Sequence, residues 1–234
     1  MKKIKISMSW SGGKDSAFAL WQLMNDTRFE VNRLHTTFGE ESRRVGMHGI
    51  HESLAEQQAK SIGLPLDKIY YPASGDNKEY EKAINTYLDT LKAEGIETIA
   101  YGDIYLEDLK AYREQQLSKR GFNAIFPLWK KDTAQAARDF IAAGFQTLIC
   151  AADADLITKK WLGKIFNLDF LENLPDQVDP CGENGEFHTF CYDGPLFKVP
   201  IKVSTREVLS KSYHFTTTEG KKIEKQFWFA DLGY

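Results

Sequence analysis

The feature that most constrains this sequence lies near its N-terminus, where a strand-like segment at 3–9 leads into Ser-Gly-Gly-Lys-Asp-Ser at 11–16. A helical face of apolar residues follows at i, i+3, i+4 and i+7: Ala17, Leu20, Trp21 and Met24. A strand, a glycine turn and a helix N-terminus in this order present backbone N–H groups and the positive end of a helix dipole to an anion. Adjacent glycines also let the backbone approach a phosphate closely. The segment therefore predicts a phosphate-binding turn in an α/β fold.

The alternation of helix and strand continues through the first two-thirds of the chain. Four helical stretches each end at a glycine that precedes an apolar run: Gly63, Gly95, Gly121 and Gly144. Glycine just past a helix end takes the left-handed conformation that stops the helix. Helices that alternate with short apolar strands are typical of βαβ units. We therefore expect an α/β fold with a doubly wound, mostly parallel sheet, to which strands at 31–38 and 148–150 belong.

After about residue 158 the pattern changes. The remaining segments are predicted to form two short helices, a loop and three antiparallel strands: 158–162, 169–174, 179–190, 197–203, 207–217 and 222–230, the last two joined by a turn at Glu219-Gly220. We therefore divide the chain into an α/β domain at 1–155 and a smaller, β-rich C-terminal region at 156–234.

Composition limits the class of partner. The chain has 234 residues, 42% of them hydrophobic, and no apolar run reaches the length needed to cross a bilayer. The N-terminus lacks the features of a signal peptide, and three cysteines without repeated spacing argue against a disulfide framework. These features predict a cytoplasmic protein with no membrane partner. A net charge of −3 disfavours nucleic acid, whose binding needs a basic surface, and a homo-oligomer stays open.

A second group of polar residues lies between the two parts of the chain. Residues 179–193 are rich in glycine and acid, and such loops between substructures often carry substrate or metal contacts. Glu183 and Glu186 have the oxygen ligands that Mg²⁺ takes beside phosphates, and either one is also a candidate to position an amine nucleophile. A tight surface turn with solvated glutamates is the plainer alternative. His188 is a candidate to orient the nucleophile, because imidazole transfers protons near neutral pH.

In an open parallel sheet, ligands bind outside the carboxyl ends of the strands. That rule selects the residues after two predicted strands: Thr36, Thr37, Phe38, Gly102 and Asp103. Arg113 follows in the next predicted helix, and its planar guanidinium can bind a phosphate or a carboxylate through two hydrogen bonds. A surface salt bridge is the alternative for Arg113.

Four motifs occur in order along the chain: Ser-Gly-Gly-Lys-Asp-Ser at 11–16, Tyr-Gly-Asp-Ile at 101–104 with Arg113, Pro-Leu-Trp at 127–129, and Cys-Gly-Glu-Asn-Gly-Glu-Phe-His-Thr-Phe at 181–190 with Asp-Gly-Pro-Leu-Phe at 193–197. In this order they resemble the diphthine–ammonia ligase family of N-type ATP pyrophosphatases, over residues 4–203. Two features depart from the family pattern. His188 stands where the family has an acidic residue, and residues 42–50 differ in sequence. The resemblance therefore leaves the substrate open.

The resemblance implies an adenine nucleotide alpha-hydrolase fold that binds ATP with Mg²⁺. It implies adenylation of a carboxylate, on a small molecule or a modified protein side chain, with loss of pyrophosphate and amide formation by ammonia or an amine. The residues expected to bind the nucleotide are Ser11, Gly12, Gly13, Lys14, Asp15, Ser16, Thr36, Thr37, Phe38 and Gly102. Those expected to act in catalysis are Lys14, Asp15, Asp103, Arg113, Glu183, Glu186 and His188. Asp15 and Glu183 are the expected ligands of Mg²⁺, and Asp15 is equally a candidate helix cap.

Two other functions share the first loop. A tRNA-modifying ATP pyrophosphatase of the thiolase or lysidine type carries the same Ser-Gly-Gly-x-Asp-Ser motif. Such enzymes usually add basic regions or paired active-site cysteines, and neither is evident in this sequence. A non-catalytic adenine-nucleotide-binding protein is the other alternative, and an intact set of charged residues argues against it: Lys14, Asp15, Glu183 and Glu186.

Overall fold

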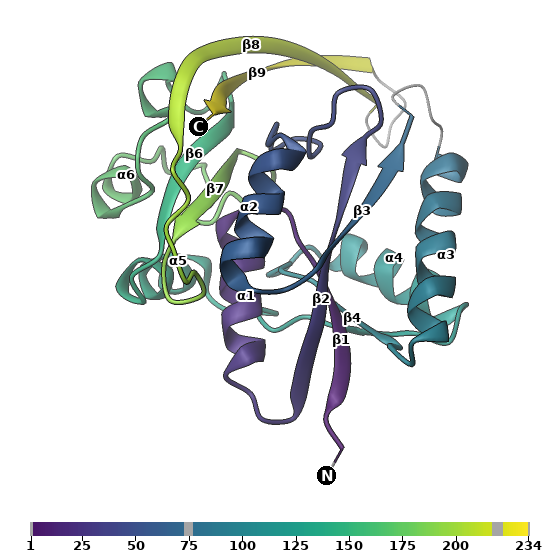
Figure 1. Cartoon of the computed structure of the whole chain (residues 1–234). Coiled ribbons are helices and arrows are strands. Elements are labelled where there is room, and N and C mark those ends of the chain that lie inside the picture. The colour runs from purple at the N-terminus through teal and green to yellow at the C-terminus, as the bar shows by residue number, and fades with distance from the viewer. Residues whose placement is uncertain (1, 73–76, 217–221, 234) are drawn as a thin grey trace.

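The computed structural model describes residues 2–72, 77–216 and 222–233 (Figure 1). Its helices and strands are, in chain order, β1 (Ile4–Ser9), α1 (Lys14–Met24), β2 (Phe29–Gly39), α2 (Glu52–Ile62), β3 (Leu66–Tyr71), α3 (Asn77–Ala93), β4 (Thr98–Ala100), α4 (Glu107–Ser118), β5 (Asn123–Ile125), α5 (Thr133–Ala142), β6 (Gln146–Asp153), α6 (Leu168–Glu172), β7 (Phe187–Asp193), β8 (Ser204–Thr216) and β9 (Lys222–Gly233). A short 3₁₀ helix, Lys159–Trp161, lies between β6 and α6.

Five strands form a parallel sheet in the order β3-β2-β1-β4-β5. One buried apolar cluster contains residues of α1 and α2, and a second contains residues of α3 and α4. The two helix pairs therefore cover opposite faces of the sheet (Figure 1). The predicted α/β class, with a doubly wound parallel sheet, is confirmed. All four predicted helix-stop glycines have positive φ, as for Gly63 at +88° after α2.

The second sheet is antiparallel, with the order β7-β6-β9-β8. The prediction that 148–150 belongs to the parallel sheet is wrong, because β6 pairs antiparallel with both β7 and β9. All of β6 except Gln146 is buried, and its middle, residues 148–152, is a continuous apolar run. Such a run fits the middle of either kind of sheet, so the pattern alone could not assign β6 to its partners.

Two further predictions for this part of the chain are wrong. Residues 197–203 form no strand, and residues 187–190, predicted as loop, begin β7 instead. The segment after 197 is held by single contacts to two elements instead of by strand pairing. Ser61 of α2 accepts the N–H groups of Lys198 and Val199, and the carbonyl of Tyr192 in β7 accepts the N–H of Ile201. The turn predicted at Glu219-Gly220 lies outside the described residues. The boundary at residue 155 stays a prediction.

The free edge of β7 lies along the glycine loop that follows β1. The N–H of Cys191 donates to the carbonyl of Gly12 over 2.8 Å. The hydroxyl of Thr189 accepts the N–H of Lys14 over 3.0 Å. One buried apolar cluster continues from the parallel sheet into the second sheet. The two sheets therefore share a core and meet at the loop.

Gln58 links α2 to both the glycine loop and β7. Its side chain is fully buried, and Nε2 donates to the carbonyls of Gly12 and Cys191 over 2.9 and 2.6 Å. Its Oε1 accepts the indole N–H of Trp10 over 2.9 Å. Buried polar groups are costly to leave without partners, so this one amide fixes the position of the loop against both sheets.

Gln58→Leu should lower the free energy of unfolding by about 3 kcal/mol, because two buried carbonyls and an indole N–H lose their partner. Urea unfolding at neutral pH measures this change. The neighbouring Gln57→Leu, on a partly exposed side chain, is the matched control and should change the free energy by less than about 0.5 kcal/mol. Equal effects of the two substitutions would contradict this role of Gln58.

Candidate functional site

The glycine loop has the geometry of an anion-binding turn. Gly12 has φ +80°, and Gly13 is the extended N-cap of α1. A Cβ on Gly12 would lie 2.7 Å from Gln58 Oε1, and one on Gly13 would lie 2.9 Å from the ring of His48. Ser11 Oγ accepts the N–H of Gly13 over 3.3 Å. Both glycines are therefore required by their surroundings, and the turn delivers the positive end of α1 to the site.

Lys14 lies under the loop with its side chain buried. Its Nζ donates to both carboxylate oxygens of Asp15 over 2.9 Å and to the carbonyl of Cys181. The rings of Phe166 and Phe187 lie within 6 Å of the same atom. Burial alone would lower the pKa of Lys14, but the acidic groups around it, Asp15 foremost, together outweigh burial and the pKa is raised. Lys14 is thus a buried cation that ties α1 to loop 179–186.

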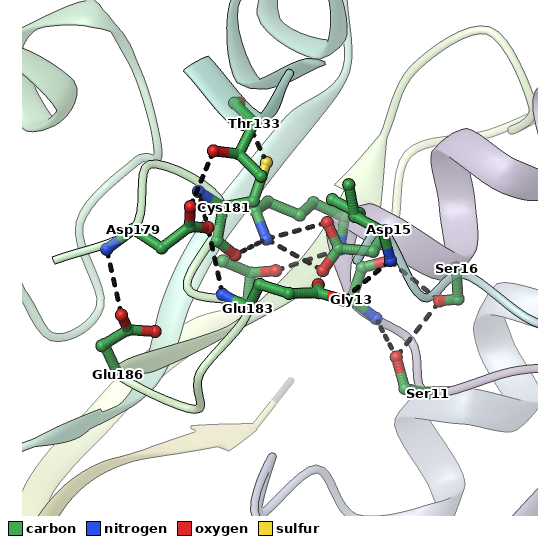
Figure 2. A network of polar contacts seen from close by, with 12 residues as sticks. Ser11, Gly13, Asp15, Ser16, Thr133, Asp179, Cys181, Glu183 and Glu186 are labelled. Atoms are coloured by element: carbon green, nitrogen blue, oxygen red, sulfur yellow. Dashed lines mark hydrogen bonds and ion pairs between the residues drawn. The ribbon is translucent and has the colours of Figure 1, made fainter. Parts of the chain in front are cut away.

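Asp15 and Glu183 lie close together near the start of α1 (Figure 2). Asp103 is a third acid near Asp15, whose charge acts on it. Glu183 Oε1 accepts the N–H groups of Ile104 and Tyr105 over 2.7 and 3.3 Å, which brings loop 179–186 to the end of β4. Burial, with a contribution from Asp15, raises the pKa of Glu183 to about 7. Burial also raises the pKa of Asp103. Negative charge is therefore concentrated where a cation would offset it.

Gly102 and Arg113 complete this end of the site. A Cβ on Gly102 would lie 2.9 Å from the backbone of Asp15, so β4 and α1 approach as closely as glycine allows. Arg113 Nε lies 3.2 Å from Asp103 Oδ2, and its guanidinium covers the ring of Tyr101 at 4.0 Å. Neither atom of the ion pair has a hydrogen bond within the described residues. Arg113 thus keeps hydrogen-bonding capacity for an oxyanion.

The described residues hold no group of three or more histidine, cysteine, aspartate or glutamate side chains arranged for a metal ion. Asp15 and Glu183 are two carboxylates beside a phosphate-binding turn. Mg²⁺ usually takes one or two carboxylates together with water and substrate phosphates, so this donor set fits it.

Glu186 has a different environment from Glu183. It is buried, and its carboxylate accepts the backbone N–H of Asp179 and both the backbone and side-chain N–H groups of Asn184, at 2.9–3.0 Å. Asp179 in turn accepts the N–H groups of Cys181 and Glu183 over 2.9 and 3.1 Å. These two acids shape the loop, and nothing in the sequence pointed to Asp179 beyond its place before a proline.

His188 projects from β7 toward His48, with ring centroids 4.6 Å apart. Nδ1 of His48 lies 3.3 Å from the carbonyl of Thr189. Burial lowers the pKa of His48 to about 4 and lowers the pKa of His188 well below its usual range, and the charge of Lys14 adds to both shifts. At neutral pH the pair is therefore uncharged. His188 was predicted as a site residue from the sequence, but its contact with His48 was not.

A cavity of about 230 Å³ lies between the carboxyl ends of β1, β2 and β4 and the helices α3 and α4. Its lining includes Ser11, Thr36, Thr37 and Arg113. Phe38 is fully buried in the core and is not part of this lining. Residues that the sequence analysis did not select also line it: His35, Tyr80, Tyr87 and Tyr101. The cavity thus joins the glycine loop to the predicted nucleotide-binding residues of β2.

Two sequence models of known domains match the chain. The diphthamide synthase N-terminal domain matches residues 3–123, and the diphthamide synthase C-terminal domain matches residues 132–233. The chain belongs to the diphthamide synthase family. The resemblance inferred from the four ordered motifs is therefore confirmed. Between them, the two matches cover both sheets of the structure apart from residues 124–125 of β5, and β6 lies in the C-terminal match.

Curated relatives in this family are named diphthine–ammonia ligase. The Homo sapiens protein is 28% identical over 234 residues, covering 89% of this chain and 86% of that protein. The Rattus norvegicus protein is 26% identical over 233 residues, with the same coverage. The Schizosaccharomyces pombe protein is 26% identical over 223 residues, and this chain spans only 36% of its length.

Among solved structures, the U34-tRNA thiolase NcsA from Methanococcus maripaludis matches with a TM-score of 0.35 and 15% identity, over 59% of this chain and 55% of that one. A score at this level has no bearing on function.

In the described parts of the chain, no helix combines the length and the apolar character that crossing a membrane requires.

Glu186→Ala should lower the free energy of unfolding by about 2–3 kcal/mol, because the buried carboxylate is lost as the acceptor of three N–H groups, one of Asp179 and two of Asn184. Glu172→Ala, at an exposed position of α6, is the control and should have little effect. Thermal and urea unfolding measure both. An unchanged stability for Glu186→Ala would show that the loop does not depend on this carboxylate.

The chain should lose stability in mild acid through His48. The pKa of His48 is near 6.5 when unfolded and about 4 when folded, so the unfolded state binds more protons between these values. Stability is then fully present above pH 6.5 and is lost as the pH falls toward 4. Between pH 7 and 5, His48→Gln should lose less free energy of unfolding than the unmodified protein, by on the order of 1 kcal/mol.

Urea unfolding at the two pH values tests this expectation, with His214→Gln on an exposed position of β8 as the control. A loss of stability in His48→Gln as large as in the unmodified protein would contradict a buried, neutral His48.

Proposed function

We propose that this chain is an ATP-dependent carbon–nitrogen ligase that adenylates a carboxylate, releases pyrophosphate and forms an amide with ammonia or an amine. The observation that carries the proposal is the meeting of the glycine turn, the acidic cluster of Asp15, Asp103 and Glu183, and an adjacent cavity. Membership of the diphthamide synthase family, with curated relatives named diphthine–ammonia ligase, supports it. The substrate would be a carboxylate of the diphthine kind or a related one.

In this proposal a carboxylate oxygen of the substrate attacks the α-phosphorus of ATP, and the bond to the bridging oxygen of the β-phosphate breaks. Ammonia then attacks the acyl carbon, the bond to AMP breaks, and the ammonia nitrogen loses a proton. The chain's own contribution is to hold the phosphates at the N-terminus of α1 and to place Arg113 near the α-phosphate or the substrate carboxylate. Asp15 and Glu183 would hold Mg²⁺, which offsets phosphate charge.

Lys14 acts in this proposal from beneath the turn. Its side chain is buried against Asp15 and Cys181, so it sets the position and charge of Asp15 rather than reaching far into the cavity. Glu186 acts through the shape of its loop. His188, paired with His48, is kept as the candidate that orients the nucleophile. We also propose a cytoplasmic location, which the buried, unpaired cysteines support.

The test is product analysis with ATP, Mg²⁺, ammonium and a diphthine-bearing protein or cell extract. Pyrophosphate and AMP should form in step with an amide, and Asp15→Asn should lower the rate by at least about a hundredfold because charge near the phosphates is lost. Asp26→Asn, in an exposed ion pair with Arg28, is the matched control and should keep the rate. Release of orthophosphate and ADP would contradict the proposal.

A further inference from the structure

A buried chain of polar groups lies beneath the cavity and begins at His35. Nδ1 of His35 lies 2.8 Å from Ser7 Oγ, and Ser7 Oγ lies 2.7 Å from the hydroxyl of Tyr87. Tyr87 donates to Asp67 Oδ2 over 3.0 Å, and Arg33 lies 3.2 Å from the same oxygen. His35, Ser7 and Tyr87 are buried, and they belong to β2, β1 and α3, respectively.

The charged end of this chain sets the direction of every hydrogen bond in it. Asp67, paired with Arg33, is a carboxylate and can only accept. Tyr87 therefore donates its only hydroxyl proton to Asp67. Burial raises the pKa of Tyr87, so the hydroxyl stays protonated. The oxygen of Tyr87 must then accept from Ser7.

The same assignment of donors and acceptors determines the tautomer of His35. The proton of Ser7 points to Tyr87, so Ser7 Oγ is left as an acceptor, and Nδ1 of His35 must carry the proton that it receives. Burial, helped by the charge of Arg113, lowers the pKa of His35 to about 3, so the ring is neutral. A neutral imidazole protonated at Nδ1 has a bare lone pair at Nε2.

His35 also lines the cavity, whose walls combine apolar and aromatic residues, such as Ile84, Leu88 and Tyr101, with polar ones, such as Glu81, Asn85 and Gln116. No hydrogen bond to Nε2 is present among the described residues. The cavity volume equals that of roughly eight liquid waters, which gives room for a planar bicyclic base. An acceptor whose tautomer is held by the buried chain behind it selects a ligand with an N–H donor at that point.

We propose that His35 is the base-selecting residue of this site: Nε2 accepts a hydrogen bond from the exocyclic amine of a 6-aminopurine, and the chain through Ser7 and Tyr87 to Asp67 holds it as an acceptor. This inference rests on the proposed use of ATP. A base with a carbonyl at the same position, as in guanine or hypoxanthine, presents an acceptor to an acceptor and is rejected.

The direct test is calorimetric binding of three triphosphates to the full chain: ATP, purine riboside triphosphate, which lacks the amine, and inosine triphosphate. The unmodified protein should bind ATP roughly tenfold more tightly than the first analogue and roughly a hundredfold more tightly than the second. Binding of ATP and purine riboside triphosphate within twofold of each other would overturn this inference and leave the proposed function standing. Failure of all three to bind would overturn both.

Tyr87→Phe tests the chain itself. Without its hydroxyl, Ser7 can donate to Nδ1 of His35, and the ring then carries its proton on Nε2 as a donor. The preference for ATP over inosine triphosphate should fall at least tenfold or reverse. Tyr70→Phe, whose hydroxyl donates to Glu52 away from the cavity, is the matched control and should keep the preference. An unchanged preference in Tyr87→Phe would overturn the inference.

Nitrogen-15 NMR of the histidine rings gives a readout that needs no ligand. His35, assigned from a His35→Gln spectrum, should show the Nδ1-protonated pattern and keep it down to about pH 4. In Tyr87→Phe the pattern should change to Nε2-protonated. An Nε2-protonated ring in the unmodified protein would overturn the inference.

Discussion

The contact between the edge of β7 and the glycine loop is the interaction on which the rest of the site depends. An edge strand presents unpaired backbone groups that a protein must cover. Here the loop after β1 covers one of them, because the carbonyl of Gly12 accepts the N–H of Cys191. Gln58 fixes the same two segments from α2. Because loop 179–186 leads directly into β7, this contact brings Glu183 to the start of α1.

The charges of the site follow from that placement. Lys14 is buried by the loop it faces, and a buried cation needs a partner, which Asp15 and the carbonyl of Cys181 provide. With Lys14 paired to Asp15, the proposed function leaves the N-terminus of α1, Arg113 and the proposed Mg²⁺ to offset the charge of the phosphates. The carboxylates that would hold that cation stay close together, at the cost of a raised pKa for Glu183.

The sequence predicted what depends on neighbouring residues and missed what depends on distant ones. The glycine turn, the helix-stop glycines and the acidic loop are local signals, and each lies where it was expected. The sheet to which β6 belongs is decided by its partners β7 and β9, which the apolar run of β6 does not encode.

The chain from His35 to Asp67 is missed for the same reason. It joins residues 28 and 80 positions apart, as in Ser7 with His35 and Ser7 with Tyr87, so no spacing rule reveals it. The partner of His188 was missed likewise, because His48 lies 140 residues away and meets it only through the fold.

The most direct test of this account is a crystal structure of the chain with Mg²⁺ and α,β-methylene-ATP, which cannot be cleaved at the bond in question. The account predicts the triphosphate at the N-terminus of α1, with the metal on Asp15 or Glu183, and the base in the cavity above His35. A nucleotide bound elsewhere, with the glycine turn and the cavity both empty at saturating ligand, would contradict it.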